Sequence, residues 1–97
     1  ELMPTDAHGT RVRVWLVERT YHDGGQNLVV LSYATPDGER YCRKELALTS
    51  FADVRDTTAA DDTVPDNLGP VDDPDRREQY AAEARRMRAA HDPDDVI

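Results

Sequence analysis

The sequence is poor in cysteine and in aromatic side chains, and it has no long hydrophobic run. Cys42 is the only cysteine, so a disulfide within the chain is excluded. No run of apolar residues approaches the length that crosses a membrane, and the first residues do not have the pattern of a signal peptide. These absences predict a cytoplasmic protein that makes no membrane contact.

Positive charge is also scarce. The 97 residues include twenty acidic and twelve basic side chains, which gives a formal net charge of −8. The acids are mostly aspartate, and Lys44 is the only lysine. Such a surface repels itself at low ionic strength, and molar salt screens that repulsion. The composition therefore predicts a halophilic protein, with an ordinary acidic protein of a mesophile as the alternative.

The residue types that bind metals are not grouped. The three histidines are far apart in the sequence, and Cys42 stands alone. Asp61, Asp62 and Asp66 form an acidic cluster, but the glycine and the closing glutamate of a calcium loop are missing. We therefore predict no metal site and no cofactor.

Catalytic patterns are missing as well. Ser32 and Ser50 have no glycine elbow around them, and no glycine-rich phosphate loop precedes a helix. Glu18 lies within a predicted strand, where a solvated or paired charge is the simpler interpretation. We predict a protein without enzymatic activity, although a deep polar pocket around Glu18, Arg19 and Arg43 would reopen that question.

What the chain does contain is a series of three β-rich runs. Asp23-Gly24-Gly25 separates the first two runs, and Pro36-Asp37-Gly38 separates the last two. The second turn suits a type I turn with Gly38 in the left-handed conformation. We predict a three-stranded antiparallel meander within 11–48, whose strands are 11–21, 27–35 and 39–46.

Both faces of this sheet are expected to be apolar. If the Pro-Asp-Gly turn sets the register, Tyr33 lies opposite Tyr41. One face then has Val29, Leu31, Tyr33, Tyr41 and Arg43, and the other has Leu28, Val30, Cys42, Lys44 and Leu46. In the first strand, Trp15 and Val17 share a side with Arg11, Arg13 and Arg19, opposite Val12, Val14 and Leu16. The register of the first hairpin stays open.

The segments around the meander have few hydrophobic residues. Residues 1–10 are predicted to be a loose tail. Ser50, with an acidic residue three positions later, is a weak capping box and predicts a short helix to about Asp56. Residues 57–73 are polar and contain two prolines, so we expect 49–73 to form this helix and an extended surface connector.

The C-terminal helix has the clearest signals. Asp73 suits the N-cap and Pro74 suits the first helical position. We predict a helix over 74–91 that Pro93 ends, followed by an acidic tail over 92–97. The apolar stripe of this helix consists of Tyr80, Ala84, Met87 and His91, widened by Ala81 and Ala90.

One helix of about eighteen residues is about 27 Å long and covers only one face of such a sheet. We therefore expect the second face to be covered by a second copy of the chain, in a two-fold homodimer. The alternative is that the connector folds back and covers this face alone. Within one domain of 97 residues, the helix could also pack on the partner's sheet.

Nucleic-acid binding is the main alternative function. A sheet face that combines aromatic rings with arginines resembles the surfaces on which single strands stack. The negative net charge speaks against it, and the rings are more simply core residues with arginines at the rim. The residues for such a nucleic-acid or partner contact are Arg11, Arg13, Trp15, Arg19, Tyr33, Tyr41 and Arg43.

Four stretches resemble a family of small uncharacterised haloarchaeal proteins. They are Val12–Tyr21, Tyr33–Arg40, the helical Tyr80-Ala-Ala-Glu-Ala84 and His91–Asp95. The resemblance implies a haloarchaeal source. It implies no activity, cofactor or catalytic residue.

The sequence thus predicts an α+β fold, in which a three-stranded meander packs against a C-terminal helix. The predicted function is a non-enzymatic homodimeric interaction or regulatory module in a high-salt cytoplasm.

Overall fold

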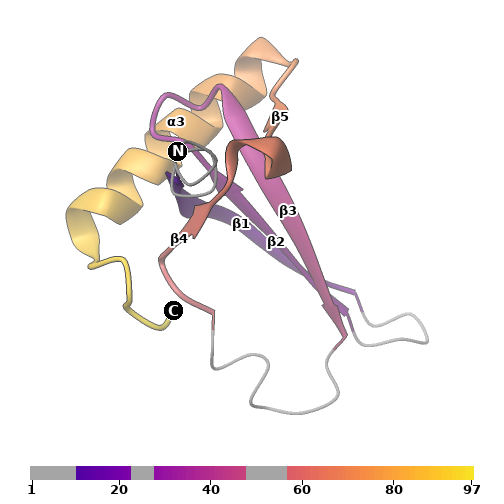
Figure 1. Ribbon diagram of the computed structural model, residues 1–97, viewed down its shortest axis with the longest axis vertical. Coiled ribbons are helices and arrows are strands. Elements are labelled where there is room, and N and C mark those ends of the chain that lie inside the picture. Colours follow the sequence, from indigo (N-terminus) through magenta and orange to yellow (C-terminus); the bar gives the residue numbers. More distant parts are fainter. Residues whose placement is uncertain (1–10, 23–27, 48–56) are drawn as a thin grey trace, which may run out of the picture.

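The computed structural model describes residues 11–22, 28–47 and 57–97. They form one antiparallel sheet of five strands in the order β4-β1-β2-β3-β5, together with one long helix (Figure 1). The elements are β1 (Val12–His22), β2 (Leu28–Ala34), β3 (Arg40–Ala47), β4 (Ala60–Thr63), the 3-10 turn η1 (Pro65–Asn67), β5 (Gly69–Pro70) and α3 (Pro74–Ala90). The predicted α+β class and the three central strands are confirmed. The predicted tail over 1–10, the first turn and the short helix before residue 57 lie outside the described residues.

The polar connector was predicted incompletely, because it adds a strand to each edge of the meander. β4 pairs with β1, and β5 pairs with the start of β3. Aspartate is uncommon in strands, which is why Asp61 and Asp62 gave no strand signal. Here each has a cation beside it: Arg13 Nε lies 2.7 Å from Asp62 and Lys44 Nζ lies 2.5 Å from Asp61. The two aspartates that weaken the strand signal of β4 in the sequence thus pair with cations of the sheet.

The predicted register of the second hairpin is wrong by one residue. Tyr33 lies opposite Cys42, and Tyr41 lies opposite Ala34. The cause is a four-residue loop, since the amide of Thr35 donates to Arg40 O at 3.0 Å. Gly38 is left-handed as predicted, with a φ of 73°.

The alternation along β1 is interrupted at Val17. Leu16 lies opposite Tyr33 and Glu18 lies opposite Ser32, so the pairing shifts between them in a β-bulge. Before the bulge, Trp15 shares a face with Ala34, whereas after it Glu18 takes that face. The prediction that Arg19 shares a face with Trp15 is therefore wrong, because it assumed unbroken alternation.

Helix α3 covers part of the sheet face on which Trp15, Ala34 and Glu18 lie, which we call the Trp15 face. Its N-cap is Asp73 as predicted, where the carboxylate accepts a hydrogen bond from the amide of Asp75 at 3.0 Å. Tyr80, Ala84 and Met87 are its buried residues. The helix packs mainly against β1 and less against β2. The neighbouring part of the same face, towards β3, borders a pocket.

The opposite face is crossed by the chain that links β4 to β5. These two strands lie at opposite edges of the sheet, and the link through η1 passes in front of the central strands in Figure 1. Thr63 is buried there, and Leu68 packs against the core. The Tyr33 hydroxyl also donates to Thr58 O at 2.8 Å. Both faces therefore receive cover from the chain itself.

The acidic tail is also part of the folded structure. The amide of Ala59 donates to Asp95 O and the amide of Ile97 donates to Thr57 O, each at 2.8 Å. Residues 92–97 thus run beside the start of β4.

Candidate functional site

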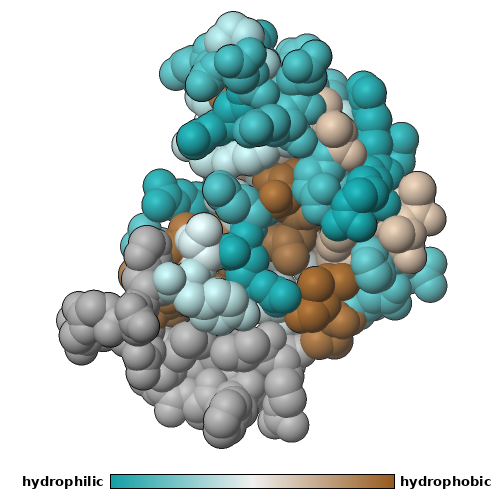
Figure 2. Space-filling view, turned by 180° about the vertical axis from the view of Figure 1, so that it is seen from behind, coloured by the Kyte–Doolittle hydropathy of each residue, from teal (hydrophilic) through white to brown (hydrophobic). Residues whose placement is uncertain are grey.

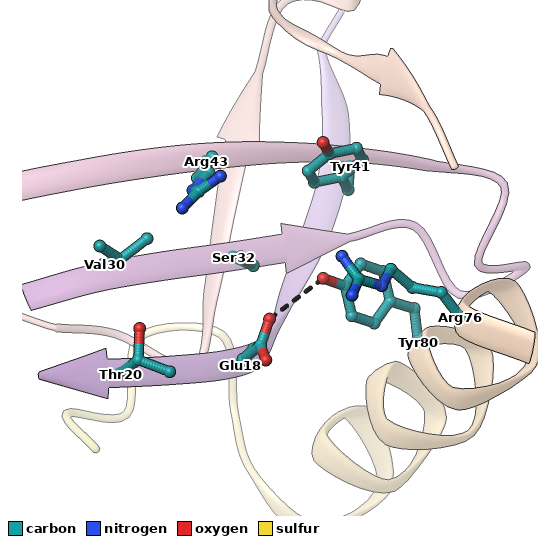
Figure 3. A pocket seen from close by; sticks show the side chains of 8 residues that line it. All are labelled: Glu18, Thr20, Val30, Ser32, Tyr41, Arg43, Arg76 and Tyr80. Atoms are coloured by element: carbon teal, nitrogen blue, oxygen red, sulfur yellow. Dashed lines mark hydrogen bonds between the residues drawn. The ribbon is translucent and has the colours of Figure 1, made fainter. Parts of the chain in front are cut away.

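The open part of the Trp15 face forms a cleft beside α3, which we call the helix–sheet cleft (Figure 3). Its volume is about 260 Å³. Helix α3 packs mainly on β1 and less on β2, and the cleft lies where Arg76 and Tyr80 of α3 face Tyr41 and Arg43 of β3. The lining residues come from four elements: Glu18, Thr20, Val30, Ser32, Tyr41, Arg43, Arg76 and Tyr80.

One wall of the cleft is organised around Tyr80. Its hydroxyl donates to Glu18 Oε1 at 3.2 Å, and its ring lies 6.0 Å from that of Tyr41 at an angle of 57°. Burial raises the pKa of Tyr80, and the negative charge of Glu18 raises it further. The phenol therefore remains protonated near neutral pH and holds the carboxylate of Glu18 in place.

Two guanidinium groups border the same space. Arg43 extends from β3, and Arg76 lies in the first turns of α3 with its guanidinium carbon 6.0 Å from the centre of the Tyr80 ring. In the described part of the chain neither forms an ion pair, whereas Arg13, Lys44 and Arg86 do. Among the described lining residues Glu18 is the one carboxylate, so these residues give the cleft a positive charge in a protein of net charge −8.

The predicted contact residues do not form one patch. Trp15 is 4% exposed and Tyr33 is 2% exposed, and the two lie on opposite faces. Arg19 lies on the Tyr33 face, where it donates to Ile97 O at 2.9 Å. Only Tyr41 and Arg43 of the predicted set reach the helix–sheet cleft.

Arg11 and Arg13 lie elsewhere on the helix side. They border a second hollow of about 450 Å³ with Trp15 and Arg88. Arg13 is already engaged there by Asp62 through two hydrogen bonds. With Arg13 engaged, this hollow still has Arg11 and Arg88, for which the described residues show no ion pair.

Sequence reasoning missed the contribution of α3 to the cleft. Arg76 and Tyr80 are four residues apart, so both project from one side of the helix. That spacing was visible, but the presence of Glu18 on the same side of the sheet was not, because it depends on the bulge at Val17. Glu18 and Arg43 do line one pocket, but Arg19 does not border it.

Metal binding, thiol chemistry and membrane crossing have little support among the described residues. Within 11–22, 28–47 and 57–97, no group of three or more histidine, cysteine, aspartate or glutamate residues could hold a metal ion. Burial raises the pKa of the Cys42 thiol, which disfavours the reactive thiolate. No helix in these ranges is long and apolar enough to cross a membrane.

Comparison with known proteins assigns no activity to this site. Residues 8–97 match a family described as "Family of unknown function (DUF7967)". Neither a curated protein nor a solved structure matches the chain.

Proposed function

This chain belongs to that family of unknown function, so the family supplies no activity. We propose a function from the geometry of the helix–sheet cleft instead. In our proposal the protein is a non-enzymatic interaction or regulatory module, and the cleft binds an anionic group. The observation that carries the proposal is the pair of guanidinium groups, Arg43 and Arg76, which border one small space without an ion-pair partner among the described residues.

The chemistry of the cleft favours recognition over catalysis. Arginine stays protonated at all ordinary pH values, so Arg43 and Arg76 are suited to hold charge and not to move protons. The hydroxyls of Thr20 and Tyr41 add hydrogen-bonding groups that can orient a ligand. A guanidinium fork matches a carboxylate or a phosphate, which makes either a suitable anionic group.

Nucleic-acid binding is less well supported by this geometry. Stacking needs accessible rings, whereas Trp15 and Tyr33 are buried on opposite faces. Tyr41 is the one ring of the predicted set that borders the cleft. An oligonucleotide that quenches Trp15 fluorescence at high salt would favour this alternative.

Self-association and a high-salt cytoplasm remain part of the proposal. The charge of −8 supports the salt adaptation and a haloarchaeal source. The argument for the dimer is weaker, because the chain that links β4 to β5 crosses the second face. Seen from behind, the coloured surface is mostly hydrophilic, and its hydrophobic residues form separate small groups (Figure 2). We retain the homodimer as a prediction to be tested by molar mass.

The cleft is tested by calorimetric titration with glutarate and with inorganic phosphate at constant ionic strength. We expect Arg43→Gln and Arg76→Gln each to weaken anion binding about tenfold, since a charge-assisted hydrogen bond contributes about 1.5–3 kcal/mol. Arg85→Gln is the matched control, because Arg85 is an exposed arginine of the same helix that does not border the cleft. Equal affinities in all four proteins would refute the proposal.

A further inference from the structure

The charges around the helix–sheet cleft are of both signs. Arg43 and Arg76 supply two positive groups, and Glu18 supplies one negative group between β1 and α3. Figure 3 shows the Glu18 carboxylate directed at the Tyr80 hydroxyl, with the guanidinium of Arg76 over the ring of Tyr80 and Arg43 across the cleft on β3. A ligand that fills this space meets all three charges.

We infer that the ligand is a small zwitterion with two carboxylates and one ammonium group, which is the chemistry of an acidic α-amino acid. The inference rests on the proposed anion binding and names its ligand class. It pairs each charge of the cleft with an opposite charge of the ligand: two carboxylates with Arg43 and Arg76, and one ammonium with Glu18.

Glu18 is the residue that distinguishes this ligand from a simple anion. Its Oε1 accepts one hydrogen bond from Tyr80, while the carboxylate remains exposed to solvent. An anion that lacks a donor would displace water from this carboxylate and face its negative charge, and both effects oppose binding. An ammonium group removes both penalties, because it donates to the carboxylate and carries the opposite charge.

The size of the cleft fits this class of ligand. A volume of about 260 Å³ lies just below the lower end, near 300 Å³, of pockets that enclose drug-sized molecules. An amino acid is smaller than such molecules. Val30 and Ser32 form a buried floor, at 5% exposure each, that can contact the short aliphatic part of the ligand.

The experiment compares L-glutamate with glutarate, which has the same two carboxylates and carbon chain but no ammonium group. Calorimetric titrations are made at constant ionic strength near pH 7, where the amine is charged. The wild type should bind L-glutamate at least tenfold more tightly than glutarate. Glu18→Gln should remove this preference and bind glutarate more tightly than the wild type does, a gain that misfolding cannot produce.

The outcomes separate the inference from the proposal beneath it. If glutarate binds the wild type as tightly as L-glutamate, or if Glu18→Gln leaves the ratio unchanged, the zwitterion is overturned. Anion binding would still stand if Arg43→Gln and Arg76→Gln weakened both ligands. If neither ligand nor phosphate binds the wild type, the proposed function fails and the inference fails with it.

Discussion

Gly38 shows how much one residue can determine in this fold. A Cβ at this position would lie 2.1 Å from Arg77 O, and the φ of +73° is strained for any side chain. Gly38→Ala should therefore destabilise the protein by about 1–3 kcal/mol. Chemical denaturation measures this loss. Gly69→Ala is the matched control, because nothing lies within 4 Å of its added Cβ. Equal stability of the two variants would contradict the hairpin–helix contact.

The left-handed conformation of Gly38 was predictable, but its close approach to α3 was not. A Pro-Asp-Gly sequence favours a left-handed glycine in any hairpin. The register, by contrast, depends on whether the loop has three or four residues. Asp37 decides this locally, since its carboxylate accepts from the Thr35 hydroxyl at 2.5 Å and from the amide of Glu39 at 2.9 Å. These bonds belong to the folded loop, and the sequence pattern does not reveal them.

At the scale of elements, α3 depends on its first turn. Asp73 caps the helix, whereas the neighbouring Asp72 is exposed and lies before the cap. Asp73→Ala should lower the free energy of unfolding by about 1 kcal/mol, and Asp72→Ala should change it by less than half as much. Thermal and urea unfolding followed by circular dichroism test this difference. A larger effect at position 72 would show that the cap is assigned to the wrong residue.

The elements differ in how well the sequence predicts them. Helix α3 has local signals at both ends, so its prediction over 74–91 agrees with Pro74–Ala90 to within one residue. β4 and β5 have no such signals, since an Asp-Asp pair and a Gly-Pro pair both disfavour strands. They form because the central sheet presents unpaired edges, and a nonlocal cause of this kind cannot be found in a local pattern.

The whole molecule is governed by its charge. Twenty acidic side chains on 97 residues should make stability rise with salt. We expect a higher melting temperature at about 2 M than at about 0.1 M salt, and light scattering in both conditions gives the molar mass. A mass twice 10.9 kDa at high salt supports the homodimer, whereas 10.9 kDa in both refutes it. A melting temperature that does not change with salt would refute the halophilic interpretation.

The candidate site is the part that sequence reasoning reached least. Glu18 and Arg43 were recognised as members of a possible polar pocket, but Arg76 and Tyr80 join them only after α3 has packed. These residues come together because of the bulge at Val17, where the alternation of the β1 side chains changes direction.

That change of direction makes Val17 unusual in a further respect. On either side of it, Leu16 and Glu18 already lie opposite consecutive residues of β2, Tyr33 and Ser32. A chain shortened by Val17 alone could therefore keep every other β1 side chain on its present face, at the expense of the packing that Val17 provides. A deletion at Thr20 would instead reverse all residues beyond it or break the pairing. Val17 is thus a place where this strand can change its length and still leave Glu18 in the cleft.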